Sequence, residues 1–537
     1  MKNIRPSLIF QFFICFTLVP LFSSLSYAID RYDVNVAKAG TGGGTVAASP
    51  EGDSCGTECW TYDDGTSITV TATADANSIF TGWTGCDSVN DKQCLVTMLS
   101  GKAISVTFSP ISRQFSSAEY DPVNNRYLSV YVAGDANYVS SRELRGQFIN
   151  YDGTKIGNEI IFALNSMMPS LAYDNVNHKF LLVAESGEHL YEGHIYGWLI
   201  GPDTGAAGSR FTISDATATR AFPFVHFNST TQRYLVVFND SKKSYGQFVN
   251  TDGSLYGTTS DTNFLIMDAD VNIPASYSPT GHKYLVVAHQ FGDGHGYGQL
   301  LNDDGTPSGG SFDITGHISG MIYPAYDSTN DRFFTSWCDF RNGDAGTMVD
   351  SLGRFIATDG TLLGDEVIIS NKNYDQHTPV SVYDPVNHRY AVVWQDMSSE
   401  GYSQANIYGQ FINEDGTHSG DEFIVNNSPG PQDFHGLAYN STCSNFLAYL
   451  TDFGLPHGDI IYSILGTPCA VPTLHADSSS RDFGVVPIGG NGVYSFEISN
   501  TGMLPLVIGN ISFSASTDFH FVVAGDDGCS GKTLNKD

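Results

Sequence analysis

The chain has 537 residues, more than a single small domain needs, and its 57 acidic against 26 basic residues give a formal net charge of -31. That charge argues against electrostatic binding to nucleic acid or to an anionic membrane. Glycine (56 residues), tyrosine (28) and phenylalanine (34) are plentiful, which is typical of turn-rich β structure. The acidity suits a soluble exported protein, and acidic loops that bind calcium are the alternative.

Residues 1–28 have the pattern of a secretory signal peptide. Lys2 and Arg5 precede an apolar run, and a small-x-small tripeptide ends at Ala28. We expect the mature chain to begin near Ile29. A lipid anchor at Cys15 is not predicted, because isoleucine precedes it where a small residue is needed. No later segment approaches the roughly 18 apolar residues of a membrane helix, so we expect an exported product without membrane insertion.

A small β module with four cysteines is predicted over residues 29–109. Its motifs GTSITVTATA and FTGWTGC and its closing VTF resemble the divergent B-repeat of internalin-related bacterial surface proteins. Close spacing favours the pairs Cys55 with Cys59 and Cys86 with Cys94, although four cysteines allow three pairings. Metal binding by these cysteines is the competing interpretation, and export to an oxidising compartment favours disulfides.

A repeat of 49 to 57 residues fills residues 110–468. Its copies are aligned by the aromatic residue that ends each first strand: Tyr120, Tyr173, Phe227, Tyr277, Tyr326, Tyr383 and Tyr439. The copy at 377–427 has four apolar runs separated by a DPVNHR turn, a polar loop and an Asp415-Gly416 turn. That pattern predicts a four-stranded antiparallel meander. Its period predicts an all-β fold with a seven-bladed propeller.

Two further motifs recur within the repeat. The second strands open with a basic and an aromatic residue, as in Arg389-Tyr390, and several third strands carry Gly-Gln-aromatic, as in Gly409-Gln410-Phe411. The repeat resembles the VVWxD, IYGQ and DGT repeats of exported bacterial proteins of unsettled role, and the resemblance implies architecture and location without catalytic residues. The seventh copy lacks a fourth strand. Closure therefore borrows the segment before Phe115 or leaves that blade three-stranded.

The remaining cysteines bear on the end of the repeat region. Cys443 lies in the first turn of the seventh copy and Cys469 follows its third strand, so both fall at the same end of a meander. A disulfide between them is predicted, with a contribution of roughly 3 to 4 kcal/mol in the chain-entropy model. Cys338 is expected to be a buried free thiol.

The final segment, residues 469–537, changes character. DFGVVPIG, ISNTGMLPLVI and GCSGKTL resemble the immunoglobulin-like modules of the abnormal-spindle and Hydin type. Such modules continue into a second cysteine and a closing strand. We therefore expect a truncated module in which Cys529 has no partner and the sheet has an open edge.

Ligand binding is predicted at the irregular end of the propeller, because long loops on a rigid scaffold carry function. Histidines and Trp-Asp pairs at that end are the candidate ligand-binding residues: His295, Trp337, Asp339, His377, Trp394, Asp396 and His435. Aromatic rings beside carboxylates suit sugar recognition, and histidines converging from several blades suit a polar ligand or a metal. The alternatives are solvated loop histidines and tryptophans that only pack in the core.

Enzyme signatures are not found: the sequence has no HExxH, GxSxG, P-loop or sialidase box. We therefore expect a secreted or cell-surface binding or adhesion protein whose propeller faces an extracellular glycan or protein. A propeller-type hydrolase or lyase acting on extracellular polysaccharide is one alternative, and a structural envelope component is another. No cofactor is expected, apart from calcium in the acidic loops.

Overall fold

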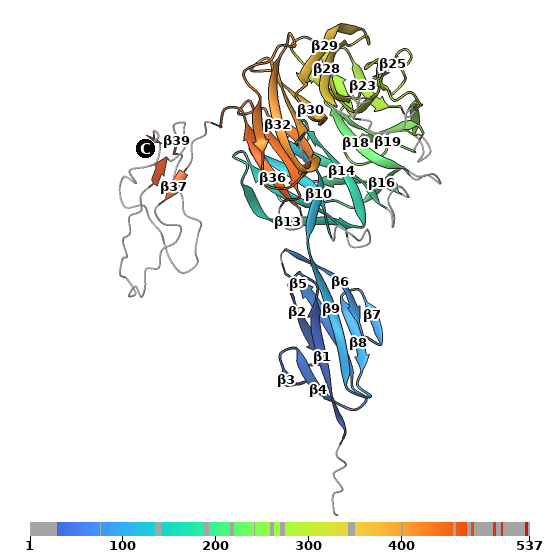
Figure 1. Cartoon of the computed structure of the whole chain (residues 1–537), viewed down its shortest axis with the longest axis vertical. Helices are drawn as coiled ribbons and strands as arrows, with labels where there is room; N and C mark the ends of the chain where they lie inside the picture. Colours follow the sequence, from blue (N-terminus) through green and yellow to red (C-terminus); the bar gives the residue numbers. More distant parts are fainter. Residues whose placement is uncertain are drawn as a thin grey trace, which may run out of the picture. The chain divides into compact units, whose positions relative to one another are not determined.

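The computed structural model describes two compact units, Met1–Ser109 and Pro110–Asp537 (Figure 1). The described residues are 29–75, 77–134, 142–186, 193–214, 220–240, 242–257, 263–268, 274–290, 292–341, 349–398, 401–454, 458–469, 474–476, 498–500, 506–508 and 532–534. The predicted signal peptide and most of the predicted immunoglobulin-like module lie outside these ranges. Within them, no helix is long and apolar enough to cross a membrane.

The first unit is built from nine strands in two sheets. They are β1 (Arg31–Ala39), β2 (Gly44–Ser49), β3 (Asp53–Gly56), β4 (Cys59–Asp63), β5 (Ser67–Ala74), β6 (Ser78–Thr84), β7 (Ser88–Asn90), β8 (Gln93–Thr97) and β9 (Lys102–Pro110). The sheet orders are β3-β4-β1-β9-β6 and β2-β5-β8-β7. In β5, with the sequence SITVTATA, alternate residues such as Ile68 and Val70 are buried. This alternation places one face of the sheet on a core that also holds Trp83 and Phe108.

Two disulfides lie in the first unit, and they join the predicted pairs. Cys55 and Cys59 close the turn between β3 and β4. Cys86 and Cys94 connect the segment after β6 to β8, where Cys94 is fully buried. Small β modules with modest cores gain stability from such cross-links.

In the second unit, seven antiparallel meanders follow one another within the described residues, and we call them sheets 1 to 7. Sheets 1 to 3 contain β10 (Ser112–Asp121), β11 (Arg126–Gly134), β12 (Glu143–Asn150) and β13 (Lys155–Leu164); β14 (Ser166–Asp174), β15 (Lys179–Ser186), β16 (His194–Ile200) and β17 (Phe211–Ser214); and β18 (Ala221–Asn228), β19 (Arg233–Asn239), β20 (Ser244–Asn250) and β21 (Phe264–Met267). Sheets 4 and 5 contain β22 (Ala275–Ser278), β23 (Lys283–His289), β24 (Gly296–Asn302) and β25 (Phe312–Asp313); and β26 (Ser319–Asp327), β27 (Arg332–Asp339), β28 (Asp350–Ala357) and β29 (Leu362–Ser370). Sheets 6 and 7 contain β30 (Gln376–Asp384), β31 (Arg389–Ser398), β32 (Gly401–Asn413) and β33 (Phe423–Asn426); and β34 (Gln432–Asn440), β35 (Asn445–Asp452) and β36 (Asp459–Leu465).

The seven sheets form a closed ring (Figure 1). The first strand of each sheet contacts the first strand of the next, and β34 of sheet 7 contacts β10 of sheet 1. The second strands are buried on both faces. On β11, Leu128 and Val130 pack against sheet 2, whereas Tyr127 and Tyr131 pack against sheet 7. This two-sided burial explains the continuous apolar runs of these strands.

The Gly-Gln motif of the third strands has a packing origin. A Cβ on Gly409 would lie 2.6 Å from the ring of Phe423 on the fourth strand, so only glycine leaves room for that ring. The amide of Gln410, which is buried, donates to the carbonyl oxygens of Phe411 (3.0 Å) and Gly420 (2.9 Å). The glycine of the motif therefore allows the fourth strand to pack closely, and the glutamine stabilises the turn that precedes that strand.

The basic residue that opens several second strands links neighbouring sheets. The Arg126 guanidinium lies 3.9 Å from the centre of the Phe148 ring and donates to the carbonyl oxygens of Pro202 and Asp203 on sheet 2. Arg332 on sheet 5 likewise donates to the Glu414 carbonyl on sheet 6. The recurrent Arg-aromatic pair is thus a contact between sheets.

Sheet 7 has three strands among the described residues, as one of the two predicted alternatives states. The segment before Phe115 pairs with β11 inside sheet 1 and does not complete sheet 7. By register, Tyr462 of β36 stands where sheets 1 to 6 have the glycine of their third strands. Tyr462 packs against the core cluster that sheets 7 and 1 share. The predicted Cys443–Cys469 disulfide joins the first turn of sheet 7 to the segment after β36.

The C-terminal segment is described only in part. It contains two short antiparallel pairs, β37 (Leu474–Ala476) with β38 (Ile498–Asn500) and β39 (Leu506–Val507) with β40 (Thr533–Leu534). Cys529, which is predicted to have no disulfide partner, lies outside the described residues. The immunoglobulin-like interpretation stays a prediction.

Candidate functional site

The innermost strands of the ring share a β-bulge near the end where the long loops lie. Six of the seven pairings between first and second strands shift register there, at Gln114/Ser117, Met167/Ser170, Ala221/Phe224, Ser319/Ile322, His377/Val380 and Asp433/Gly436. Phe115, Met168, Phe222 and Thr378 take positive φ angles of 54°, 47°, 54° and 56° in these bulges. Such conformations cost on the order of 1 to 3 kcal/mol each and cluster at functional sites.

The sequence carries a signal for these bulges that the repeat pattern alone did not reveal. A proline follows the positive-φ residue in Met168-Pro169, Phe222-Pro223 and Thr378-Pro379. Proline cannot donate a hydrogen bond to a neighbouring strand, so within sheets it marks edges and bulges. The first strands are edge strands, and the prolines locate the point where their pairing breaks.

Five polar and aromatic residues come together at this end of sheets 6 and 7, and we call them the mouth cluster: Asp375, His377, Tyr402, Asp433 and His435. Tyr402 donates its hydroxyl to Asp433 Oδ2 at 3.1 Å. His377 Nε2 lies 3.8 Å from Asp375 Oδ2. His435 Nε2 lies 2.7 Å from the carbonyl oxygen of Thr378, the bulged residue of the neighbouring sheet. The bulge therefore positions the cluster across two sheets.

The mouth cluster is negatively charged near neutral pH. Burial lowers the pKa of His377, although the charges of Asp375 and Asp433 act to raise it. Burial also lowers the pKa of His435, against the effect of Asp433. Both imidazoles are therefore neutral at pH 7. The two carboxylates then dominate the electrostatics of the cluster.

Aromatic surface borders the carboxylates. Tyr402 is 44% exposed, and Tyr374, which directly precedes Asp375 in the sequence, is 49% exposed. The Phe340 ring centre lies 6.1 Å from that of His377. Exposed aromatic faces beside acceptor oxygens suit a ligand with apolar ring faces and many hydroxyl groups.

Two of the seven predicted ligand-binding residues, His377 and His435, meet in the mouth cluster. His295 belongs to sheet 4, where its Nδ1 lies 2.7 Å from Asp313. Asp433 and Tyr402 were not singled out from the sequence, because a carboxylate among 57 acidic residues carries no signal by itself. Their importance follows only from the contact between β32 and β34.

The two Trp-Asp pairs do not form a sugar-stacking surface. Trp337 and Trp394 are fully buried, so neither offers a ring face to a ligand. Trp337 donates to Asp339 at 3.2 Å, and Asp339 accepts from Arg341 at 2.7 Å. The tryptophans pack in the core of the second strands, and this burial favours the packing alternative over ligand binding.

Asp396 on β31 has a pKa above the usual range of an aspartate. Burial, followed by the nearby charge of Glu422, raises the pKa of Asp396 to about 6. Lys372 forms an ion pair of 2.6 Å with Glu422 and acts in the opposite direction on Asp396. Sheet 6 therefore carries a buried carboxyl group, Asp396, whose pKa is raised and which lies near a second carboxyl group, Glu422.

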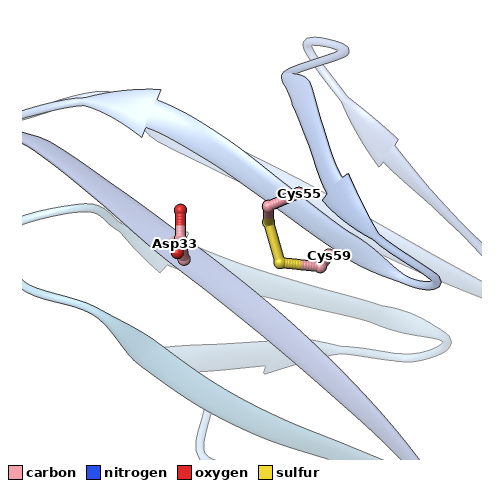
Figure 2. Close-up of side chains that lie close together, drawn as sticks. All are labelled: Asp33, Cys55 and Cys59. Carbon is pink, nitrogen blue, oxygen red and sulfur yellow. A yellow bond between two sulfur atoms is a disulfide. The ribbon is translucent and has the colours of Figure 1, made fainter.

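One group of metal-type ligands within the described ranges has its atoms within 4.8 Å of one another: Asp33, Cys55 and Cys59. Figure 2 shows Asp33 beside the two cysteines, whose sulfur atoms are bonded to each other. A disulfide offers no thiolate to a metal, and Asp33 already accepts a hydrogen bond of 2.6 Å from Thr61. This group is a disulfide site with an adjacent carboxylate.

Comparisons with known proteins find one family model and several similar solved structures. Residues 34–112 match the family model described as the divergent InlB B-repeat domain, which confirms the predicted B-repeat. The β-propeller domain of the Trilobed protease from Pyrococcus furiosus is similar over 66% of this chain and 92% of that chain, at 9% identity and a TM-score of 0.37. A search of curated proteins finds no match.

Two further solved structures are similar to the chain. Kuenenia stuttgartiensis hydrazine synthase covers 65% of this chain and 95% of its own, at 9% identity and a TM-score of 0.44. A putative 6-phosphogluconolactonase from Bacteroides uniformis covers 64% and 100%, at 12% identity and a TM-score of 0.41. Neither likeness says anything about activity. The disulfides and the B-repeat fit an extracellular protein.

Proposed function

We propose that the protein is a secreted or cell-surface binding protein whose mouth cluster receives an extracellular glycan. The observation that carries the proposal is the meeting of Asp433, Tyr402 and His435 from two sheets at the loop end of the ring. Carboxylate oxygens accept hydrogen bonds from sugar hydroxyls, and an exposed tyrosine packs on the apolar face of a sugar ring. The rigid ring positions these groups in advance, which reduces the entropy cost of binding.

Further architectural features belong to this proposal. The seven sheets are the blades of one seven-bladed propeller over residues 110–468. The B-repeat module of residues 29–109 and an immunoglobulin-like module of residues 469–537 act as spacers. Residues 1–28 direct export. The disulfides and the B-repeat match support the extracellular location in this proposal.

A glycan array probed with the full mature chain tests the proposal. We expect binding to one or more glycans by the wild type, and at least about tenfold weaker binding by Asp433→Asn and by Tyr402→Phe, because each loses one hydrogen bond of the site. Asp365→Asn is the matched control, since Asp365 is an exposed carboxylate on β29. Equal binding by all four proteins, or binding to protein ligands alone, would contradict the glycan assignment.

A second candidate function is supported by Asp396. A carboxyl group with a pKa of about 6 beside a second carboxyl, Glu422, resembles the arrangement of an acid and a base in polysaccharide cleavage. Release of new reducing ends from a glycan that the protein binds, lost in Asp396→Asn and retained in Asp365→Asn, would favour a hydrolase or lyase. Binding without turnover would favour the first function.

A further inference from the structure

The three disulfides of the described residues differ in how well the fold protects them. Cys94 is fully buried on β8, a strand paired on both sides, and it belongs to the core cluster of the first unit. In the Cys443–Cys469 pair, Cys469 is 9% exposed. Cys55, in contrast, is exposed, and its strand β3 is a short edge strand on which every residue is exposed. The Cys55–Cys59 disulfide is therefore the most accessible of the three.

The strand register shows that Cys59 lies on the outer face of its sheet. Val34 of β1 is fully buried in the core, so its neighbours Asp33 and Asn35 face away from the core. Thr61 of β4 pairs with Asp33, and Cys59 pairs with Asn35, which places Cys59 on the same outer face. Cys59 is 8% exposed and is not a member of the core cluster. The turn from β3, and not the core, therefore covers its sulfur atom.

The turn that carries this disulfide is held more firmly at Cys59 than at Cys55. The Val36 amide donates to the carbonyl oxygen of Glu58 at 3.0 Å, so β1 holds the residue next to Cys59. The pairing of β3 with β4 shifts register at Cys55, which is the unpaired residue of a bulge. The two cysteines are four residues apart, so their bond closes a very short loop and its opening frees little of the chain. The bond can therefore open while the sheet stays intact.

A carboxylate stands beside the two sulfur atoms. An oxygen of Asp33 and the sulfur atoms of Cys55 and Cys59 all lie within 4.8 Å of one another (Figure 2). Thr61 donates its hydroxyl to Asp33 at 2.6 Å, which fixes the position of the carboxylate. The cations nearest to Asp33 in the sequence pair with other carboxylates: Arg31 with Asp53 and Asp63, and Lys38 with Glu58. The surface around the disulfide therefore has more carboxylates than cations.

We propose that Cys55–Cys59 is a thiol–disulfide exchange site that takes external thiols, and that it prefers neutral or cationic thiols to anionic ones. Exposed disulfides are the labile ones in proteins, and the excess of carboxylates around this one repels an anionic thiol. The site lies in the first unit and does not depend on the glycan proposal. It lets the protein hold a thiol-bearing molecule through a reversible covalent bond.

The exchange follows from the exposure of the two sulfur atoms. An external thiolate attacks Cys55 Sγ, the exposed sulfur, and the bond to Cys59 breaks as the new sulfur–sulfur bond forms. Cys59 leaves as a thiolate and takes a proton from water. In the closing step, the Cys59 thiol gives its proton to the Asp33 carboxylate and attacks Cys55 Sγ. The external sulfur leaves as a thiolate and takes that proton back from Asp33.

Treatment of the full mature chain with cysteamine, a cationic thiol, tests the site without any substitution. Samples are quenched with N-ethylmaleimide at intervals, and peptide mass spectrometry reports which cysteines have opened. We expect Cys55 and Cys59 to open at least about tenfold faster than the Cys86–Cys94 and Cys443–Cys469 pairs, with the cysteamine adduct on Cys55. Earlier opening of another pair, or an adduct on Cys59, would overturn the proposal.

The charge preference is measured with two thiols of opposite charge, cysteamine and mercaptoethanesulfonate. The ratio of their opening rates is compared between proteins, because the comparison cancels their different intrinsic reactivities. We expect the preference for cysteamine to fall at least about threefold in Asp33→Asn. Asp64→Asn is the matched control, since Asp64 is an exposed carboxylate in the turn after β4. An unchanged ratio in Asp33→Asn would overturn the assigned class of thiol.

The closing step is measured on the cysteamine adduct of Cys55 after transfer to a thiol-free buffer. We expect loss of the adduct at about pH 6.5 to be at least about tenfold slower in Asp33→Asn than in the wild type. The two rates should converge near about pH 9.5, where hydroxide removes the proton of the Cys59 thiol without help. Cys59→Ser should keep the adduct, because it has no attacking sulfur. Equal rates at about pH 6.5, or loss of the adduct from Cys59→Ser, would overturn the proposed roles.

Discussion

Arg113 and Glu159 form an ion pair of 2.6 Å at the seam between the first and last sheets of the ring. Arg113 also lies 3.6 Å from Asp459 on sheet 7, and Tyr131 donates to Glu159 at 2.6 Å. The Glu159 side chain is 21% exposed and that of Arg113 is 9% exposed. A partly buried network thus joins sheets 1 and 7, where no shared strand closes the ring.

Removal of Glu159 is expected to open this seam. Burial alone would raise the pKa of Glu159, but hydrogen bonds from Arg113 and Tyr131 lower it to about 2. A lowered folded-state pKa means that its stabilisation, about 3 kcal/mol at most, is complete above about pH 4.5 and is lost as the pH falls toward 2. Urea unfolding of Glu159→Gln at pH 7 should show a free energy of unfolding that is lower by this amount. Below about pH 4.5 the stability of the variant should depend less on pH than that of the wild type. Asp365→Asn should unfold like the wild type, and an unchanged acid limb in Glu159→Gln would contradict the role of the seam.

The Cys443–Cys469 disulfide links the first turn of sheet 7 to the segment after β36. It stands at the end of the sheet that lacks a fourth strand, so its loss should destabilise the ring by roughly 3 kcal/mol. Cys443→Ser, Cys469→Ser and the double variant should lower the urea midpoint by the same amount, because each breaks the same bond. Cys338→Ser is the control, since Cys338 is a buried free thiol. Unequal losses among the three variants would show that packing of the individual residues matters more than the bond.

Much of this fold could be predicted from the sequence because its determinants are local and repeated. About 50 consecutive residues form each sheet, and turn motifs such as Asp-Gly mark the ends of its strands. The close cysteine pairs need only a short loop between them. The closure of the ring could not be predicted in the same way. It depends on Glu159, Arg113 and Tyr462, which meet across the two ends of the repeat array.

The candidate site was predicted only in part, for a related physical reason. His377 and His435 were visible because histidine is rare in the chain (15 residues). Asp433, Tyr402 and the bulged Thr378 gain meaning only through contacts between sheets 6 and 7. For Trp337 and Trp394 the sequence cannot distinguish a ring that packs inward from one that faces solvent, and the burial of both rings favours packing.

Gly409 gives a direct test of the packing explanation for the Gly-Gln motif. A Cβ there would lie 2.6 Å from the Phe423 ring, so Gly409→Ala should destabilise the protein by about 1 to 3 kcal/mol through overpacking. Gly310→Ala is the control, because nothing lies within 4 Å of its Cβ position. Phe423→Leu should recover part of the loss in the double variant. Additive losses in a double-mutant cycle of chemical denaturation would argue against the contact.

Glu119, on β10 of sheet 1, should make the protein less stable as the pH rises. Its folded-state pKa is raised to about 8, whereas the carboxyl titrates near 4.5 when the chain unfolds. Because the folded-state pKa is raised, the contribution of this carboxyl to the free energy of unfolding is most favourable below about pH 4.5. It decreases as the pH rises from about 4.5 to 8 and stays low above pH 8. The full penalty is at most about 5 kcal/mol, because each pKa unit corresponds to about 1.4 kcal/mol. Glu119→Gln cannot ionise, so it should unfold at a higher urea concentration than the wild type at pH 8.5 and at nearly the same concentration at pH 5. Asp365→Asn should show no such divergence. Parallel stability curves for the wild type and Glu119→Gln from pH 5 to 8.5 would show that the carboxyl is solvated in the folded ring.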